Sequence, residues 1–422
     1  MNKAREKASV EMSDSGGAAG IRQDGFKEAY SARLLGVFAS SLKLGLTSFG
    51  GPVAHLGYFR HEYVERRRWV DERSYAELVA MCQFLPGPAS SQVGIGIGTI
   101  RAGWLGGVVA WLGFTAPSAL LLMLFGFYIQ YATPGSMGWI HGLKLVAVAI
   151  VAHAVLGMGQ KLITGPALAA VALLAAAVSL LWPSVYSQVS VLAAAGIFGC
   201  FRRAERTQEG KPMFAESPMG IGKLAGACCL LLFGLLLVLL PLLSRASGHP
   251  LLQMTDGVYR AGSLVFGGGH VVLPLLEREF LSAGWVSRGD FLAGYGAAQA
   301  VPGPLFTFVS YLGMAGFGVG GALLATAAIF LPAFLLVFGV LPFWNVVRKQ
   351  PRLQGSVAAV NAAVVGILAA AFYNPIWISA VNGAADLAAA AVLFALLQFA
   401  KAPPWIIVLL GLLYGLGSSL VG

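Results

Sequence analysis

Two glycine- and proline-rich motifs occur twice in this chain, and they are the residues best suited to bind an anion. Phe-Gly-Gly occurs once in each half, and Pro-Gly-Pro follows each copy at nearly the same distance. Glycine lets a ligand reach the backbone, and a helix that begins after such a break directs N–H groups and a positive dipole end towards it. We therefore expect an anion site formed by these motifs and their polar neighbours, namely Ser48, Phe49, Gly50, Gly51, Pro52, Gln83, Pro86, Gly87, Pro88, Ser91, Phe266, Gly267, Gly268, Gly269, His270, Gln299, Pro302, Gly303, Pro304 and Thr307.

A simpler interpretation is that glycine and proline only kink the helices or let them pack closely. That interpretation suffices for one Pro-Gly-Pro, but two motifs repeated at matched spacing favour a site. Unpaired backbone groups are costly in a bilayer, so broken helices persist where they are buried in protein or face a polar cavity.

Charged residues complete the candidate site. Lys43 and Arg260 lie at matched positions, about two helical turns before the Phe-Gly-Gly motifs. A cation inside an apolar segment usually faces a polar pathway, although it can also reach the membrane surface. Two such cations suit an anion with more than one negative charge. For energy coupling, the candidates that could exchange a proton are Glu62, Glu277, Glu279 and His270, although His270 also fits a structural role in the interior.

The composition indicates that these residues belong to a membrane protein. Hydrophobic residues make up 57% of the chain, charged residues only 11%, and the mean hydropathy is +0.76. We predict an all-α polytopic membrane protein. The first thirty residues have no apolar core and are expected to form a cytoplasmic tail rather than a signal peptide. The net charge of +10 is expected to orient the chain in the membrane, with no nucleic acid as partner. Metal-ligand spacings and enzyme signatures are absent from the sequence, which predicts no catalytic residues, no metal and no cofactor.

The repetition defines the expected organisation. Residues 1–30 form the tail, 31–201 the first repeat, 202–244 a polar linker with one unpaired helix, and 245–422 the second repeat. An unpaired helix between the repeats would invert the second one, giving two inverted-topology repeats with broken or re-entrant helices and about 13 membrane segments. These segments are expected at 34–49, 75–100, 104–131, 140–159, 167–182, 185–201, 221–243, 251–266, 291–314, 319–344, 357–372, 376–399 and 405–420.

One connection does not fit this topology. With the N-terminus inside, the basic linker at 202–211 and Lys401 fall on the cytoplasmic side, whereas residues 60–73 fall outside despite several arginines. Either these arginines have a local purpose, or the segment before Gly50 is re-entrant. The amphipathic stretch 53–73 itself is typical of an interfacial helix.

The paired Phe-Gly-Gly and Gln-x-x-Pro-Gly-Pro motifs, with Glu62 and Trp69 between them, resemble the chromate ion transporter family in its long-chain, two-unit form. The resemblance covers the chain after residue 30. It implies a bacterial inner-membrane exporter that confers chromate resistance, is driven by the membrane potential or a proton gradient, and has sulfate as a competing oxyanion. It also implies that Arg60, Glu62 and Trp69 are functionally sensitive, with a coupling or gating role.

The expected function is therefore a secondary transporter of chromate or a sulfate-like oxyanion, with the lipid bilayer as its surroundings and a proton as a candidate coupling ion. A passive oxyanion channel, or a transporter of sulfate or another anion, remains the alternative. A membrane-embedded reductase would need a redox cofactor, for which the sequence shows no ligands. A monomer and a homodimer both remain open.

Overall fold

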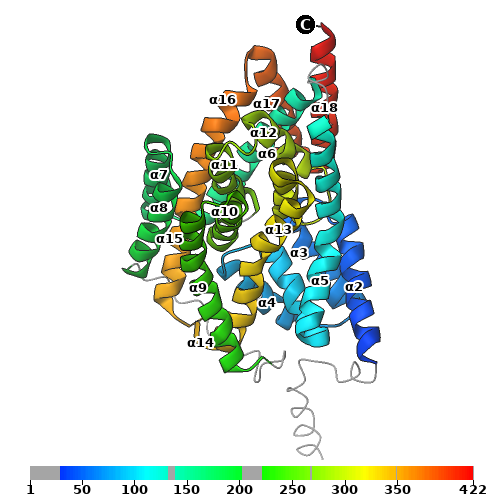
Figure 1. Cartoon of the computed structure of the whole chain (residues 1–422), viewed down its shortest axis with the longest axis vertical. Coiled ribbons are helices and arrows are strands. Elements are labelled where there is room, and N and C mark those ends of the chain that lie inside the picture. The colour runs from blue at the N-terminus through cyan, green and yellow to red at the C-terminus, as the bar shows by residue number, and fades with distance from the viewer. Residues whose placement is uncertain (1–28, 132–137, 202–220, 267–268, 348, 422) are drawn as a thin grey trace, which may run out of the picture.

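The computed structural model describes residues 29–131, 138–201, 221–266, 269–347 and 349–421, and the regular structure in these ranges is all helical (Figure 1). The predicted all-helical fold is therefore confirmed. Four regions on which expectations were placed lie outside the described residues: the polar tail, the linker at 202–220, the connection at 132–137, and the pair Gly267 and Gly268.

The first repeat contains two long helices, of 43 and 25 residues, among shorter ones. Pro52 lies in the first turn of α3, where its missing N–H costs nothing, and Asp71 caps α4 by accepting a 2.9 Å hydrogen bond from the Ser74 N–H. The elements are α2 (Tyr30–Thr47), α3 (Gly51–Phe59), the π-helix η2 (Arg60–Arg66), α4 (Glu72–Phe84), α5 (Ala89–Tyr131), α6 (Gly138–Leu162), α7 (Pro166–Leu181) and α8 (Val185–Phe201).

The second repeat follows the unpaired helix α9 (Lys223–Ser247) and has the same plan. Ser287 caps α12 as Asp71 caps α4, accepting from the Asp290 N–H at 3.1 Å. The elements are α10 (Pro250–Leu264), η4 (Gly269–Val271), α11 (Val272–Ser282), α12 (Arg288–Ala298), η5 (Leu305–Thr307), α13 (Phe308–Val340), η6 (Leu341–Phe343), α14 (Trp344–Val347), α15 (Pro351–Ala371), η7 (Phe372–Trp377), α16 (Ile378–Ala380), α17 (Ala384–Gln398) and α18 (Pro404–Val421).

Both repeats contain the same sharp turn inside a long helical segment. Gly103 interrupts α5 with φ 69° and ψ −163°, and Gly318 interrupts α13 with φ 68° and ψ −162°. These are matched positions, and the near-identical dihedral angles show that the repeated sequence folds into a repeated structure. The predicted boundaries at 100–104 and 314–319 correspond to these turns.

In the first repeat, two later turns of the chain lie beside the start of α2. The Trp69 ring lies beside Gly36 near the start of α2, and the Arg101 guanidinium lies 5.3 Å from the centre of that ring. The Tyr30 hydroxyl also donates to the Ala102 carbonyl. The start of α2, the turn after η2 and the turn inside α5 therefore lie together. The α2–α3–η2 and α4–α5 segments each run inward to a break and back, which agrees with the re-entrant alternative for the segment before Gly50.

Helix lengths agree with these returning pairs. Among the described residues, five helices are long and apolar enough to cross a membrane: Ala89–Ile129, Gly138–Leu162, Lys223–Ser247, Leu305–Phe343 and Pro351–Ala380. Four shorter apolar helices accompany them: Pro166–Leu181, Ser187–Phe201, Ala384–Gln398 and Pro404–Ser418. The predicted single segment at 376–399 was wrong, because the chain breaks between α16 and α17.

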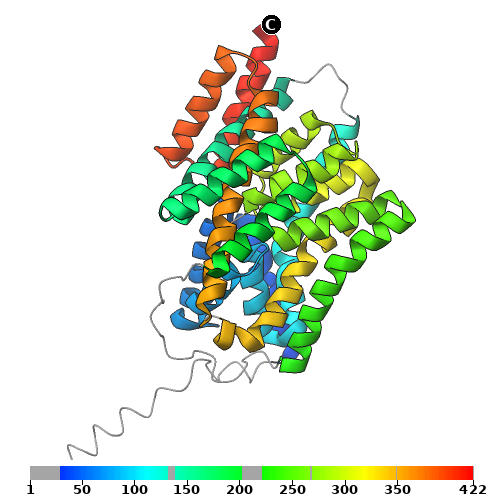
Figure 2. The same ribbon diagram turned by 90° about the vertical axis from the view of Figure 1, so that its left-hand side faces the viewer.

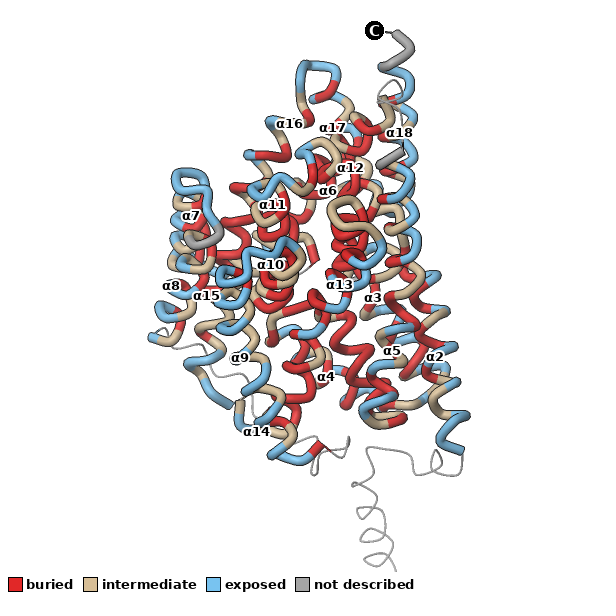
Figure 3. The backbone as a smooth tube through the Cα atoms, in the orientation of Figure 1, coloured by how far each residue is buried: buried red, intermediate tan, exposed pale blue. Residues whose placement is uncertain are grey.

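The core lies where both repeats meet, and the outer helices are apolar on their exposed faces. Of the most apolar window of α13, 72% is buried inside the protein, but only 6% of that of α9, which lies at the edge of the bundle (Figures 2 and 3). Leu231, Leu239 and Leu242 of α9 are exposed. An exposed apolar helix of this length is stable in lipid, where its leucines remain in a hydrocarbon environment.

Candidate functional site

Two backbone hydrogen bonds tie the repeats together at their helix breaks. The Gly303 N–H donates to the Ser48 carbonyl at 2.9 Å, and the Gly87 N–H donates to the Val265 carbonyl at 2.7 Å. Each bond joins the Pro-Gly-Pro turn of one repeat to the residue that precedes Phe-Gly-Gly in the other. This reciprocal exchange is the pattern that a local two-fold relation between the repeats produces.

Within each repeat, a further contact brings the two helix breaks together, so that the four breaks form a ring. In the first repeat, His55 Nδ1 lies 3.3 Å from Ser90 Oγ, which joins α3 to the start of α5. In the second, a Cβ on Gly269 would lie 3.2 Å from Leu305 Cβ, which places η4 against η5. We call residues 48–55 with 86–92 the first junction, and residues 265, 266 and 269–272 with 302–308 the second junction. The four helix breaks therefore lie side by side rather than scattered over the surface.

Glycine is required at both crossing points. Gly87 has φ +115° and Gly303 has φ +100°, values that side-chain-bearing residues rarely adopt. A Cβ would also lie 3.0 Å from Gln92 Nε2 at the first position and 2.9 Å from Ser118 Oγ at the second. The two turns thus leave room only for the backbone.

Several buried polar atoms at and beside the first junction have no hydrogen-bond partner in the structure. They are Ser48 Oγ, His55 Nε2, Ser91 Oγ, Gln92 Oε1 and Thr115 Oγ1, and each of these residues is at most 2% exposed. An unpaired buried polar group costs about 1–3 kcal/mol, so natural proteins supply a partner, water or a ligand. Hydroxyl and imidazole N–H groups are suitable partners for oxyanion oxygens.

The remaining predicted residues of the motifs are placed unequally. Gly50 adopts a left-handed conformation at the start of α3, and Phe49, Pro52 and Phe266 are partly buried. The side chain of Gln83 is exposed, whereas that of Gln92 donates to the Pro86 carbonyl at 2.8 Å. In the second repeat, Pro302 and Pro304 are buried, Thr307 Oγ1 donates back to the Pro304 carbonyl at 2.7 Å, and the half-buried Gln299 has an unpaired Nε2.

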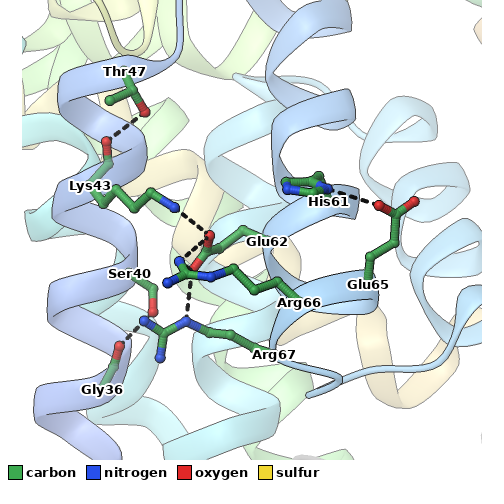
Figure 4. Close-up of polar contacts among 9 residues, drawn as sticks. All are labelled: Gly36, Ser40, Lys43, Thr47, His61, Glu62, Glu65, Arg66 and Arg67. Atoms are coloured by element: carbon green, nitrogen blue, oxygen red, sulfur yellow. Dashed lines mark hydrogen bonds and ion pairs between the residues drawn. The ribbon is translucent and has the colours of Figure 1, made fainter.

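Lys43 does not stand alone but joins a cluster around Glu62 (Figure 4). The Glu62 carboxylate, whose side chain is 2% exposed, accepts from Lys43 Nζ at 2.8 Å, Arg66 at 3.0 Å and Arg67 at 2.7 Å. Burial raises the pKa of this carboxyl, but the hydrogen bonds from Lys43, Arg67 and Arg66 outweigh burial and lower the pKa to about 2. Glu62 is therefore ionised at neutral pH, and the cluster has more cations than anions.

Arg260 has the opposite balance. It donates to Asp256 at 2.8 Å and lies 3.1 Å from Glu279. The Lys43–Glu62 pair of the first repeat thus has a counterpart in Arg260–Glu279, but here two carboxylates face one cation. The sequence predicted that Lys43 and Glu62 correspond to Arg260 and Glu279. It did not predict that the cation and the carboxylate of each repeat form an ion pair.

The other predicted coupling and gating residues lie around these clusters. Trp69 stacks on Tyr63 at 5.5 Å and carries the Arg67 guanidinium 4.9 Å from its ring centre. Arg60 is exposed and binds Glu65 and Glu72 instead of Glu62. His270 Nδ1 lies 2.7 Å from the Tyr295 hydroxyl, and Glu277 is buried on α11.

The sequence did not predict five residues of this region: His55, Gln92, Thr115, Arg66 and Arg67. His55 lies four residues after Gly51, and Gln92 lies five residues after Gly87. Polar residues in the first turn after each motif could therefore have been predicted to face the site. Arg66 and Arg67 lie in the stretch 53–73, whose amphipathic pattern indicates an interfacial helix rather than a charged cluster. No signal in the sequence identified Thr115.

In the part of the chain that the structure describes, no group of three His, Cys, Asp or Glu side chains could hold a metal ion. The chemistry that the site offers is hydrogen bonding and positive charge, which suit an anion.

The fold and the site define a multi-pass helical membrane protein built from two repeats that meet at broken helices. A family model described as chromate transporter matches residues 35–200 and again residues 252–416, so the chain belongs to the chromate transporter family. The predicted family and its long-chain, two-unit form are confirmed.

Curated relatives agree with this assignment. The chain is 27% identical to the chromate transport protein of Pseudomonas aeruginosa over 338 residues, which is 79% of each chain. It is 28% identical to the probable chromate transport protein of Synechococcus elongatus (81% of this chain, 84% of the relative) and to the chromate transport protein of Cupriavidus metallidurans (78% and 79%). No solved structure matches the chain.

Proposed function

We propose that this protein is a secondary transporter that moves chromate, or a sulfate-like tetrahedral oxyanion, out of the cytoplasm through the ring of helix breaks. The observation that carries the proposal is the ring itself: two crossed backbone bonds hold the four breaks together beside buried, unpaired polar atoms. Broken helices next to polar side chains are the usual form of a substrate site in transporters of this size. The names of the curated relatives support chromate as the oxyanion.

The proposed topology has two inverted repeats. The re-entrant pairs remove four of the thirteen predicted crossings, and the five long helices with the four shorter ones then give nine crossings. With α9 as the unpaired crossing, the second repeat enters the membrane from the opposite side. This arrangement also moves the arginines of residues 60–73 to the cytoplasmic side, as the distribution of basic residues in membrane proteins requires. We place the protein in the bacterial inner membrane with the N-terminus inside.

The driving force in this proposal is the membrane potential or a proton gradient. Moving one charge through 100 mV is worth about 2.3 kcal/mol, so an inside-negative potential favours export of a dianion by about 4.6 kcal/mol. Export would lower cytoplasmic chromate and confer resistance. If protons are exchanged, the candidates are the buried Glu277, Glu279 beside Arg260, and His270 beside Tyr295.

Charge also distinguishes the two repeats. Three cations surround Glu62, so the face of α2 and η2 keeps an excess of positive charge, and Lys43 and Arg66 are half-exposed there. Such an excess raises the local concentration of a dianion before it reaches the first junction. In the second repeat the Arg260 charge is already balanced by Asp256 and Glu279.

The test is flux of labelled chromate in proteoliposomes, with the pH gradient and the membrane potential imposed separately. We expect saturable flux that follows the imposed gradient and falls when sulfate is added. Lys43→Ala should reduce this flux, whereas Lys161→Ala, which removes an exposed cation at the end of α6, should not. Flux that never saturates would instead support the passive channel, and flux of sulfate without chromate would support a different oxyanion.

A further inference from the structure

Within the two junctions, the matched positions that differ in polarity have the polar residue in the first repeat, except that His270 of the second repeat matches Val53 of the first. At six pairs of matched positions the first repeat has a polar side chain and the second an apolar one. These pairs are Ser48 and Val265, His55 and Val272, Ser90 and Phe306, Gln92 and Phe308, Thr115 and Phe330, and Ser118 and Ala333. All twelve residues are buried, with at most 3% of each exposed. The difference in polarity therefore does not arise because one repeat exposes these positions to water and the other exposes them to lipid.

The hydrogen bonding of the two junctions differs in the same sense. At the first, the Ser91 hydroxyl has no partner, and Ser48 and Thr115 also retain unpaired hydroxyls. At the matched position of the second, Thr307 is satisfied by the Pro304 carbonyl. Gln299 has an unpaired nitrogen near the second junction, but its side chain is only half-buried.

Aromatic packing fills the second junction. Phe306 lies 6.1 Å from Phe330, and Phe308 is stacked on Tyr311 at 6.0 Å with further edge contacts to Phe291 and Tyr295. Phe306, Phe308 and Phe330 occupy the positions that correspond to Ser90, Gln92 and Thr115, and their rings offer an oxyanion no hydrogen bonds. The hydroxyls of Tyr295 and Tyr311 are already paired, with His270 and with the Asp290 carbonyl.

The charges point to the same repeat independently. The elements on either side of residues 48–55, α2 and η2 with the turn after it, carry the cluster in which three cations face one carboxylate. The corresponding cluster of the second repeat has two carboxylates and one cation.

We propose that the protein binds one oxyanion per chain and that the first repeat alone supplies its ligands, from the first junction and the neighbouring Thr115 of α5. The second junction, whose Thr307 hydroxyl and His270 Nδ1 already have partners, forms the opposing wall. The ligands are the hydroxyls of Ser48, Ser91 and Thr115 and the His55 Nε2–H, in the tautomer whose Nδ1 accepts from Ser90. Gln92 is a positioning residue, because its amide holds the Pro86 carbonyl and thereby the Pro-Gly-Pro turn. This inference rests on the proposed function and specifies which half of the ring carries it.

The test is equilibrium binding of radiolabelled chromate to the purified full chain in lipid nanodiscs. Ser91→Ala should weaken binding about tenfold, the loss expected for one hydrogen bond to a charged ligand. Ser91→Thr, which restores the hydroxyl of the second repeat's motif, should recover most of the affinity. Thr307→Val should weaken binding far less than Ser91→Ala. Ser310→Ala, which removes a buried hydroxyl paired with Thr326, is the control for folding and should bind as the wild type does.

The number of bound ions per chain and the relative losses of affinity test the inference. A stoichiometry of one chromate per chain together with the unequal losses supports the inference. Two bound ions per chain, or equal losses from Ser91→Ala and Thr307→Val, would overturn it while leaving the transporter function intact. A wild-type protein that binds no chromate would overturn the proposed function and this inference with it.

Discussion

At the residue scale, the Glu62 carboxylate organises the first repeat's charges. It is almost completely buried and accepts hydrogen bonds from Lys43, Arg66 and Arg67, which come from α2, η2 and the turn after η2. The sequence identified Lys43 and Glu62 individually from their matched positions in the repeats. It could not reveal the pair, because the two residues lie on different elements and their spacing follows no helical period.

Glu62→Gln should lower the free energy of unfolding by about 1–3 kcal/mol. Removing one partner of a fully buried ion pair typically costs about 3–5 kcal/mol, but the cations here are partly exposed and would regain water. The measurement is thermal unfolding of the purified protein in detergent. Glu65→Gln is the matched control, because Glu65 makes only exposed pairs, which contribute little to stability. Equal effects of the two substitutions would show that the Glu62 cluster does not stabilise the fold.

At the element scale, the helix breaks could be predicted because glycine and proline cannot continue a helix at these positions. The sequence indicated the interruptions at Gly50 and at both Pro-Gly-Pro motifs, and the structure has them there. It did not indicate which breaks touch, because Gly87 and Val265 are far apart along the chain and meet only through the packing of whole helices. The sequence left a re-entrant path open only for the segment before Gly50, and it did not indicate the return of the chain between α4 and α5.

Gly303→Ala should abolish or strongly reduce transport, whereas Gly165→Ala should not. Both glycines have φ +100°, so both substitutions place a side chain in a strained backbone at a cost of about 1–2 kcal/mol. Only at Gly303 would the new Cβ meet neighbours, with Ser118 Oγ at 2.9 Å, while Gly165 has open space around it. Chromate flux in proteoliposomes at matched protein content separates the two effects. Similar losses in both variants would mean that strain, rather than displacement of the crossing turn, limits transport.

At the scale of the whole molecule, two copies of one unit exchange hydrogen bonds reciprocally, yet they differ in polarity and charge. Duplication is visible in the sequence, as is the apolar character that requires a bilayer. The thirteen segments expected from hydropathy include those that contain α2, α4 and α10, none of which is among the described helices that are long and apolar enough to cross a membrane. In the proposed topology these helices belong to returning pairs. The proposed inversion of the second repeat follows from counting crossings after those pairs are removed.

Inverted repeats predict that matched turns face opposite sides of the membrane. In a background with the four natural cysteines replaced, Arg68→Cys after η2 should react with a membrane-impermeant thiol reagent only from the cytoplasmic side. Ser282→Cys at the end of α11 should react only from the outside, and both positions are exposed. The measurement is labelling of intact cells compared with inverted membrane vesicles. Labelling of both positions from one side would contradict the inversion.

The central claim is that the broken helices hold the oxyanion where the two repeats cross. The most direct measurement is an anomalous difference map, recorded at the chromium absorption edge, from crystals of the protein equilibrated with chromate. The account predicts one peak per chain at the first junction, within hydrogen-bonding distance of the Ser48 and Ser91 hydroxyls. A peak confined to the exposed surface, or one among the aromatic side chains of the second junction, would contradict it.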